Sequence, residues 1–210
     1  MTGKLRIIGG RWRGRKLRVP DLPGLRPSGD RSREVLFNWL QGAVQGARCL
    51  DLFAGTGALG LEAASRGASC VVFVEQDRRL CERLRMLGEQ WPEGEALKVV
   101  QSEAAGWLER AEGPFDIAFV DPPFSSGLYA AALQGLARPG LLAPGAMVYI
   151  ESDARSPAPF DVSDDGPAPP ASGACRAGDS NAPLSTQTNW CIRREKKLGE
   201  VRMQLLQVLD

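Results

Sequence analysis

The chain has 210 residues, of which 43% are hydrophobic and 24% charged, and its formal net charge is +1. This length suits one well-cored domain with extensions, and the composition is that of an ordinary globular protein. No apolar run approaches the ~20 residues of a membrane span, and the start of the chain lacks a signal-peptide core.

Histidine is absent, which argues against a zinc site or a histidine-dependent triad. The five cysteines are odd in number and form no C-x-x-C pair, so we expect reduced thiols in a cytosolic protein.

The charge is unevenly distributed along the chain. Residues 1–34 contain ten Lys or Arg residues and three acidic ones, a net charge of +7, so the remaining 176 residues sum to −6. A basic leader on a mildly acidic body favours a polyanionic partner that binds the leader.

Within the leader, residues 5–19 predict two short strands around a glycine-rich bend, a β-hairpin. Arg11, Arg13 and Arg15 alternate, so we expect them to share one face of a strand. With Lys16 they are interpreted as a nucleic-acid contact, and the alternative is a charged edge strand that prevents aggregation. For Trp12, packing on the body is favoured over stacking on a base.

A loop over residues 20–27 precedes a helix that Ser28 or Asp30 can cap and that is predicted to reach residue 43. Arg26, Arg31 and Arg33 lie at or before the start of this helix. They are candidates for contacts to phosphates or to the target base, and a plain surface role is equally compatible with the sequence.

Residues 49–60 organise the rest of the chain. A strand predicted over residues 48–53 runs into Gly55, Gly57 and Gly60, which have the spacing G-x-G-x-x-G, and a helix follows. This strand, turn and helix form the first crossover of an open parallel sheet, and the glycines let backbone approach a ligand. The alternative is that the glycines only permit close packing.

Nicotinamide dinucleotide enzymes share this glycine spacing, but Asp51 would repel a pyrophosphate. A carboxylate there suits a ligand that carries an ammonium and a sulfonium group, which indicates S-adenosylmethionine (SAM).

Two further acids follow the next predicted strands, over residues 71–74 and 97–100. Glu75 is placed to accept both ribose hydroxyls of an adenosine. Glu103 can accept the adenine amino group, or it can simply be an acid favoured at a helix N-terminus. The predicted cofactor site consists of Asp51, Phe53, Ala54, Gly55, Thr56, Gly57, Glu75, Gln76, Glu103 and Ala104.

The strand predicted over residues 115–120 is almost continuously apolar, as a central parallel strand should be. It ends in Asp121-Pro122-Pro123-Phe124. Two prolines cannot continue a ladder, so the chain leaves the sheet at its carboxyl edge, where ligands bind in this architecture.

A helix over about 128–137 and a strand over 146–151 complete the parallel part. Residues 154–188 are rich in Ala, Pro, Ser, Gly and Asp and predict a long loop or a disordered insert. Residues 190–193 and 201–208 predict a closing antiparallel hairpin.

Four blocks of the chain, in order, resemble those of the bacterial small-subunit ribosomal RNA guanine-N2 methyltransferases, the RsmD family. They are residues 6–17 (RIIGGRWRGRKL), 25–39 (LRPSGDRSREVLFNW), 51–60 (DLFAGTGALG) and 121–124 (DPPF). The resemblance covers about 1–153 and resumes at 190–206. It implies a class I methyltransferase fold and a guanine of the small subunit as target. The insert at 154–188 is longer than the family's usual connection, and Glu103 stands where an Asp is frequent.

We therefore predict an α/β class I SAM-dependent methyltransferase fold of the Rossmann-like type, with a seven-stranded, mostly parallel sheet between helices. Residues 1–27 form a basic hairpin and loop, and residues 28–210 the methyltransferase domain. Asp121 and the carbonyl of Pro122 are expected to accept the two hydrogens of the target amino group, while Phe124 stacks on the base. The expected partner is 16S ribosomal RNA in the small subunit, bound by a cytoplasmic monomer without metal.

Three rival functions remain open at this point. An adenine-N6 methyltransferase of DNA or RNA would use the same Asp-Pro-Pro-Phe motif. A dinucleotide oxidoreductase shares the glycines, and a non-catalytic RNA-binding assembly protein would keep the basic leader.

Overall fold

The computed structural model describes residues 4–18, 29–124, 127–161 and 190–209. Its strands are β1 (Lys4–Arg6), β2 (Lys16–Arg18), β3 (Arg48–Asp51), β4 (Cys70–Glu75), β5 (Leu97–Gln101), β6 (Phe115–Val120), β7 (Leu142–Asp153), β8 (Trp190–Leu198) and β9 (Val201–Val208). Its helices are α1 (Asp30–Trp39), α2 (Ala58–Ser65), α3 (Arg78–Gln90), α4 (Ala104–Leu108) and α5 (Tyr129–Leu136), with a 3-10 turn η1 (Gly94–Ala96).

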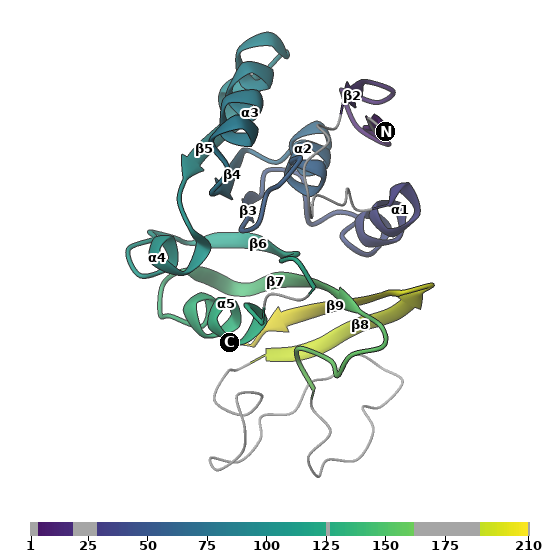
Figure 1. Cartoon of the computed structure of the whole chain (residues 1–210), viewed down its shortest axis with the longest axis vertical. Helices are drawn as coiled ribbons and strands as arrows, with labels where there is room; N and C mark the ends of the chain where they lie inside the picture. Colours follow the sequence, from purple (N-terminus) through teal and green to yellow (C-terminus); the bar gives the residue numbers. More distant parts are fainter. Residues whose placement is uncertain (1–3, 19–28, 125–126, 162–189, 210) are drawn as a thin grey trace.

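Within these residues, seven strands form one sheet in the order β5-β4-β3-β6-β7-β9-β8, and β1 pairs with β2 in a separate hairpin (Figure 1). The strands from β5 to β7 in this order are mutually parallel, whereas β9 is antiparallel to both β7 and β8. The arrangement confirms the predicted Rossmann-like fold with its closing hairpin.

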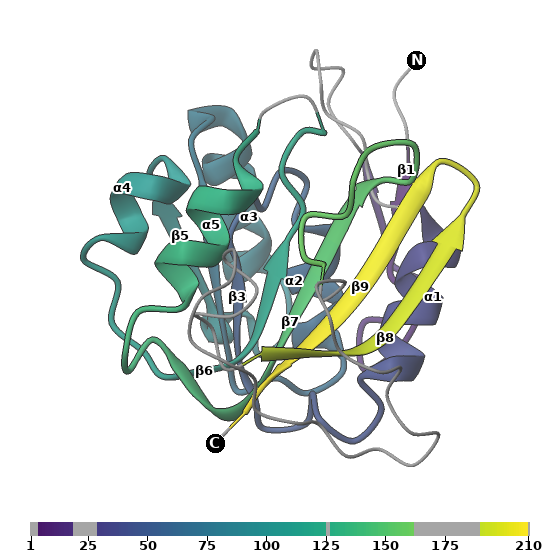
Figure 2. The ribbon, with the colours of Figure 1, turned by 90° about the horizontal axis from the view of Figure 1, so that it is seen from below.

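Helices cover both faces of the sheet, as Figure 2 shows. On one face, α1, α2, α3 and the β1–β2 hairpin bury a core that includes Leu36, Leu61, Leu84 and Phe119. On the other face, α4 and α5 pack on residues such as Val120 and Ile150. The alternation of Phe119 and Val120 between the two cores follows from the two-residue period of a strand.

The hairpin is shorter than predicted, and this changes the position of its arginines. Residues 11–14 form turns between β1 and β2, so Arg11, Arg13 and Arg15 do not share a strand face as expected. Trp12 is only 2% exposed, and its indole nitrogen donates to the carbonyl of Pro92 at 3.1 Å, which confirms the packing role. The glycine at position 10, with φ of +73°, allows the tight approach of this turn to the backbone of Ser65.

The first residues of the predicted insert are ordered against the sheet. Phe160 is 5% exposed and lies 6.3 Å from the ring of Trp190, and its carbonyl accepts a hydrogen bond from Gln204. The loop predicted from residue 154 therefore includes a packed part, and residues 162–188 lie outside the described residues.

The cysteines follow the expectation in part. Cys49, Cys70 and Cys81 are free, whereas Cys191 on β8 is disulfide-bonded, which contradicts the prediction of five reduced thiols. Of the helices in the described part of the chain, none is long and apolar enough to cross a membrane.

Candidate active site

The carboxyl ends of the parallel strands meet at one edge of the sheet, and acidic residues follow four of them. In sheet order these are Glu103 after β5, Glu75 at the end of β4, Asp51 at the end of β3 and Asp121 directly after β6. Residues separated by up to 70 positions in sequence therefore line one edge, as the parallel arrangement predicts.

The glycine turn joins β3 to α2 at this edge. Gly55 and Gly57 have φ of +51° and +78°, a conformation that side chains with a Cβ rarely adopt. Gly60 has a different reason: a Cβ there would lie 2.3 Å from the ring of Phe73. For Gly60 the alternative of close packing, in this case of α2 on β4, is therefore the explanation.

Asp51 is 2% exposed, and its Oδ2 accepts a hydrogen bond from the backbone of Gly60 at 2.9 Å. The carboxylate thus faces the first turn of α2. Burial raises the pKa of Asp51 to about 7, the bond from Gly60 lowers it, and the charge of Glu75 raises it. A buried carboxylate held by a backbone N–H is suited to a cationic ligand.

Glu75 ties the glycine turn to the tip of β4. Its Oε2 accepts from the backbone N–H of Gly55 at 2.7 Å and its Oε1 from that of Asp77 at 2.8 Å. Each carboxylate oxygen retains a second lone pair, so these bonds hold Glu75 in place without using its full capacity as an acceptor.

The other predicted cofactor residues follow β3, β4 and β5 along the same edge. Phe53 and Gly55 are half-buried, Ala54, Thr56 and Gly57 are buried, and Gln76 is exposed. Glu103 is exposed and is the N-cap residue of α4, without a side-chain capping bond, so a favourable charge at this helix N-terminus and a contact to adenine both stay predictions. Ala104 is the first residue of α4.

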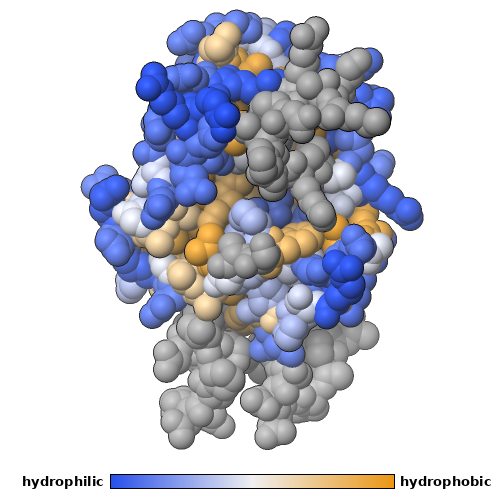
Figure 3. All heavy atoms as spheres, in the orientation of Figure 1, coloured by the Kyte–Doolittle hydropathy of each residue, from blue (hydrophilic) through white to orange (hydrophobic). Residues whose placement is uncertain are grey.

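The Asp121-Pro122-Pro123-Phe124 segment leaves the sheet after β6, with Asp121 and Phe124 half-buried and Pro122 buried. The chain then reaches α5, whose first residue, Tyr129, donates to the carbonyl of Glu151 on β7 at 2.9 Å. Apolar side chains gather in the middle of the face shown in Figure 3, surrounded by hydrophilic ones. Leu128, 39% exposed, follows the motif on its way to α5.

The predicted RNA-binding residues separate into four groups, the last of which is Arg33. Arg13, Arg15, Lys16 and Arg31 are exposed, and Arg15 lies over the ring of Trp91. Arg11 forms an ion pair with Glu93 and donates to the carbonyl of Ala64. Arg26 lies outside the described residues.

Arg33 corrects the prediction, because its side chain is 0% exposed. It donates to Glu62 at 3.4 Å, to Asp30 at 2.5 Å and to the carbonyl of Arg6 at 2.9 Å. A side chain sealed in this way does not reach RNA.

Glu62 is the centre of this buried ion pair and was missed by sequence reasoning. It is 0% exposed on α2 and accepts from the backbone of Ile8 and Gly9 and from the side chains of Arg33 and Arg66. The carboxylate therefore fastens the hairpin and α1 to the helix that follows the glycine turn. The sequence of α2 gives no signal for this role, since three of the donors, Ile8, Gly9 and Arg33, lie far away in sequence and only Arg66 is a near neighbour.

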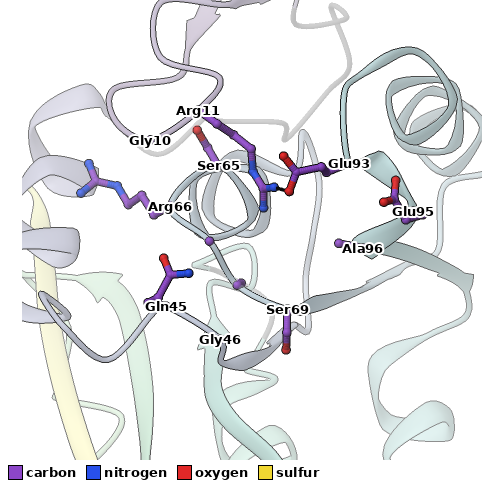
Figure 4. Close-up of a pocket in the computed structure, with 12 residues that line it drawn as sticks. Gly10, Arg11, Gln45, Gly46, Ser65, Arg66, Ser69, Glu93, Glu95 and Ala96 are labelled. Carbon is purple, nitrogen blue, oxygen red and sulfur yellow. Dashed lines mark ion pairs between the residues drawn. The ribbon is translucent and has the colours of Figure 1, made fainter.

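Two hollows, of about 750 and 400 Å³, lie at the opposite, amino edge of the sheet. The larger contains Arg11 beside Glu93, with Gln45 and Arg66 across from them (Figure 4). The lining residues of both hollows include none of the four acids at the carboxyl edge, so we do not place the cofactor there. No group of three or more His, Cys, Asp or Glu that could hold a metal occurs among the described residues.

Residues 5–163 match a family model described as "Conserved hypothetical protein 95". Ribosomal RNA small subunit methyltransferase D of Escherichia coli (strain K12) is 43% identical over 98% of this chain and 91% of its own length. The protein of the same name from Haemophilus influenzae is 36% identical, over 98% and 94% respectively. The chain belongs to the ribosomal RNA small subunit methyltransferase D (RsmD) family.

Solved structures agree with membership of the RsmD family. A putative methyltransferase from Escherichia coli superimposes with a TM-score of 0.76 at 39% identity, over 99% of both chains. A putative methylase from Haemophilus influenzae gives 0.73 at 33% identity, over 99% of this chain and all of its own. The sheet and the helices around it thus have the fold of a methyltransferase.

Proposed function

We propose that this protein transfers a methyl group from SAM to the exocyclic N2 of a guanine in 16S ribosomal RNA, in the cytoplasm and as a monomer. Membership of the RsmD family supports the coarser part of this function, SAM-dependent methylation of ribosomal RNA. The observation that carries the proposal is the position of Asp121-Pro122-Pro123-Phe124 directly after β6, on the edge that also holds Asp51 and Glu75.

The residues at this edge fit SAM. Asp51 offers a buried carboxylate to the positively charged methionine part, and Glu75 offers an oriented carboxylate to the ribose. Gln76, Glu103 and Ala104 lie further along the edge, where the adenine would be held. When bound, SAM supplies an electrophilic methyl group on its sulfonium.

The chain's own contribution to chemistry is orientation of the acceptor nitrogen. An exocyclic amino nitrogen is a poor nucleophile because its lone pair is delocalised into the ring. Asp121 and the carbonyl of Pro122 accept its two hydrogens and turn the lone pair out of the ring plane, and Phe124 stacks on the base. Alignment of this kind supplies up to about 7–11 kcal/mol of a barrier.

RNA is gripped, in this proposal, by the exposed cations Arg13, Arg15, Lys16 and Arg31. The turn formed by residues 11–14 contacts the C-terminal end of α2. This helix has eight residues, so its C-terminal end lies about 12 Å from the glycine turn at its start. Contacts there position a large RNA without taking part in the reaction. Arg26 stays a proposal from sequence, and Arg11 contributes less because Glu93 already pairs with it.

The test is the identity of the methylated nucleoside. Small subunits that lack the modification are incubated with SAM and this protein, and their RNA is digested and analysed by mass spectrometry. We expect N2-methylguanosine at one position. Formation of N6-methyladenosine would support the rival enzyme, and absence of any methyl transfer would support a non-catalytic assembly protein.

A further inference from the structure

A fifth carboxylate, Glu151 on β7, continues the row of acids along the carboxyl edge. In sheet order β7 follows β6, so Glu151 lies beyond Asp121 on the side away from the glycine turn. The proposed function uses Glu103, Glu75, Asp51 and Asp121 but gives Glu151 no task.

Strand register places Glu151 beside Asp121. Phe119 pairs with Tyr149 and Val120 with Ile150, so Asp121 and Glu151 are the next two neighbours along these parallel strands. Alternation puts both on the face of Phe119 and Tyr149, the face that α1 and α2 cover.

Two tyrosines hold Glu151 in place. Tyr149 donates its hydroxyl to Oε2 of Glu151 at 2.7 Å, and Tyr129 donates to the backbone carbonyl of Glu151 at 2.9 Å. Burial raises the pKa of both tyrosines, and the charges of Glu151 and Asp121 raise it further, so both carboxylates lie close to these hydroxyls.

Glu151 is 5% exposed, yet within the described parts of the chain no Lys or Arg forms an ion pair with it. Tyr149 occupies Oε2 of Glu151. The fully buried side-chain atoms without a hydrogen-bond partner do not include Oε1, so this oxygen keeps some accessible surface for a ligand. Burial raises the pKa of Glu151, while the bond from Tyr149 lowers it. A buried carboxylate that has no cation as partner costs folding free energy, and a ligand with a hydrogen-bond donor would offset that cost.

The position of Asp121 decides which group of the target base can donate to Glu151. The Watson–Crick edge of guanine presents the N2 amino group and, next to it, the N1–H donor. Adenine presents its N6 amino group next to N1, which is an acceptor. With the amino group held at Asp121, an acceptor at the adjacent position favours guanine and repels adenine.

We propose that Glu151 determines base specificity by accepting the N1–H of the target guanine. This inference rests on the proposed function and names the group that separates guanine from adenine in that site. The cation of SAM is not the ligand of Glu151, because Asp51 and the glycine turn lie on the other side of Asp121.

The experiment uses small subunits whose 16S RNA carries 2-aminopurine in place of the mapped target guanine. This base keeps the 2-amino group but lacks N1–H. We expect the wild-type protein to methylate it at least about 100-fold less efficiently, in kcat/KM, than guanine, because a site built for a donor rejects an analogue that lacks it.

Glu151→Gln should narrow this guanine to 2-aminopurine ratio at least about tenfold, since the Gln amide can donate to N1 of 2-aminopurine. Its Kd for SAM should stay at the wild-type value. The matched control is Asp153→Asn, which removes an acid from the same strand that is paired with Arg155; it should keep the wild-type ratio.

A Glu151→Gln variant that folds and keeps the wild-type ratio overturns the proposal. Should that variant fail to fold, Tyr149→Phe removes the hydroxyl that orients the carboxylate and must lower the ratio severalfold; an unchanged ratio again overturns it. Either result leaves the proposed function intact if the wild-type protein still makes N2-methylguanosine, so the two failures are distinguishable.

Discussion

Replacing Arg33 by Met tests whether the hairpin and the methyltransferase body are one folding unit. The substitution keeps an unbranched side chain in the buried site but removes the cation that contacts Glu62, Asp30 and the carbonyl of Arg6. It leaves Glu62, itself 0% exposed, with Arg66 as its remaining cation. We propose that residues 4–18 unfold together with the body because of this ion pair.

Breaking a buried pair by removing one partner costs about 3–5 kcal/mol. Arg66 still pairs with Glu62, so we expect a loss of about 3 kcal/mol for Arg33→Met, at the lower end of that range. In Glu62→Gln, one amide oxygen must serve the backbone N–H groups of Ile8 and Gly9, which adds about 1–3 kcal/mol for an unpaired donor. The double variant should lose less than the sum of the two, since the same contact is counted in both.

The assay is urea unfolding, followed by far-UV circular dichroism and by tryptophan fluorescence, to which Trp12 and Trp91 contribute from the hairpin contact. Arg78→Met is the control, because its ion pair with Glu82 is exposed and should contribute less than about 1 kcal/mol. A loss below about 1 kcal/mol for Arg33→Met, or a fluorescence transition that precedes the circular dichroism transition, would refute the reasoning.

Three further outcomes are expected. Burial raises the pKa of Asp51 to about 7, against about 3.9 in an unfolded chain. Between these pH values the folded protein binds more protons than the unfolded chain. The stability of the ligand-free protein therefore falls as pH rises through this window, by at most ~1.4 kcal/mol per pH unit. Calorimetry should show this dependence flattened in Asp51→Asn, and an identical pH profile would contradict the assignment. Glu75→Ala should weaken SAM binding by about 1–3 kcal/mol, because the ribose hydroxyls lose their acceptor; unchanged affinity in titration calorimetry would remove Glu75 from the site. Replacing Arg13, Arg15 and Lys16 by Gln should lower the log–log salt slope of RNA binding by about 0.7–0.9 for each lost phosphate contact, with SAM affinity unchanged, and a wild-type slope would make the turn only a charged surface.

The parallel sheet and its edge could be predicted from sequence because each piece of evidence is local. Each predicted strand carries an acid in or directly after its last residues, at Asp51, at Glu75 and at Asp121, and parallel strands bring such ends together. Glu151 ends its predicted strand in the same way, so the signal that found the other acids could have found it as well. Trp12 was also predicted to pack on the body, and its side chain is buried.

Contacts between distant residues could not be predicted. Arg33 has the local sequence of a surface cation at a helix start, and only the approach of α2, 29 positions later, buries it against Glu62. Gly60 looks like part of a ligand turn, whereas its neighbour Phe73 decides its role. Composition suggested an unstructured insert from residue 154, but Phe160 packs near Trp190, the first residue of β8. Neither segment alone contains a signal for this contact.

The central claim, that Asp121 orients the acceptor nitrogen and does not hold the cofactor, is tested by comparing turnover with SAM binding in Asp121→Ala. Single-turnover methylation of small subunits should slow by about 100-fold or more, as removal of a group that acts only in the transition state requires, while the Kd for SAM stays within about twofold. Turnover within a few-fold of the wild type, or a loss of SAM affinity that accounts for the whole effect, would contradict the account.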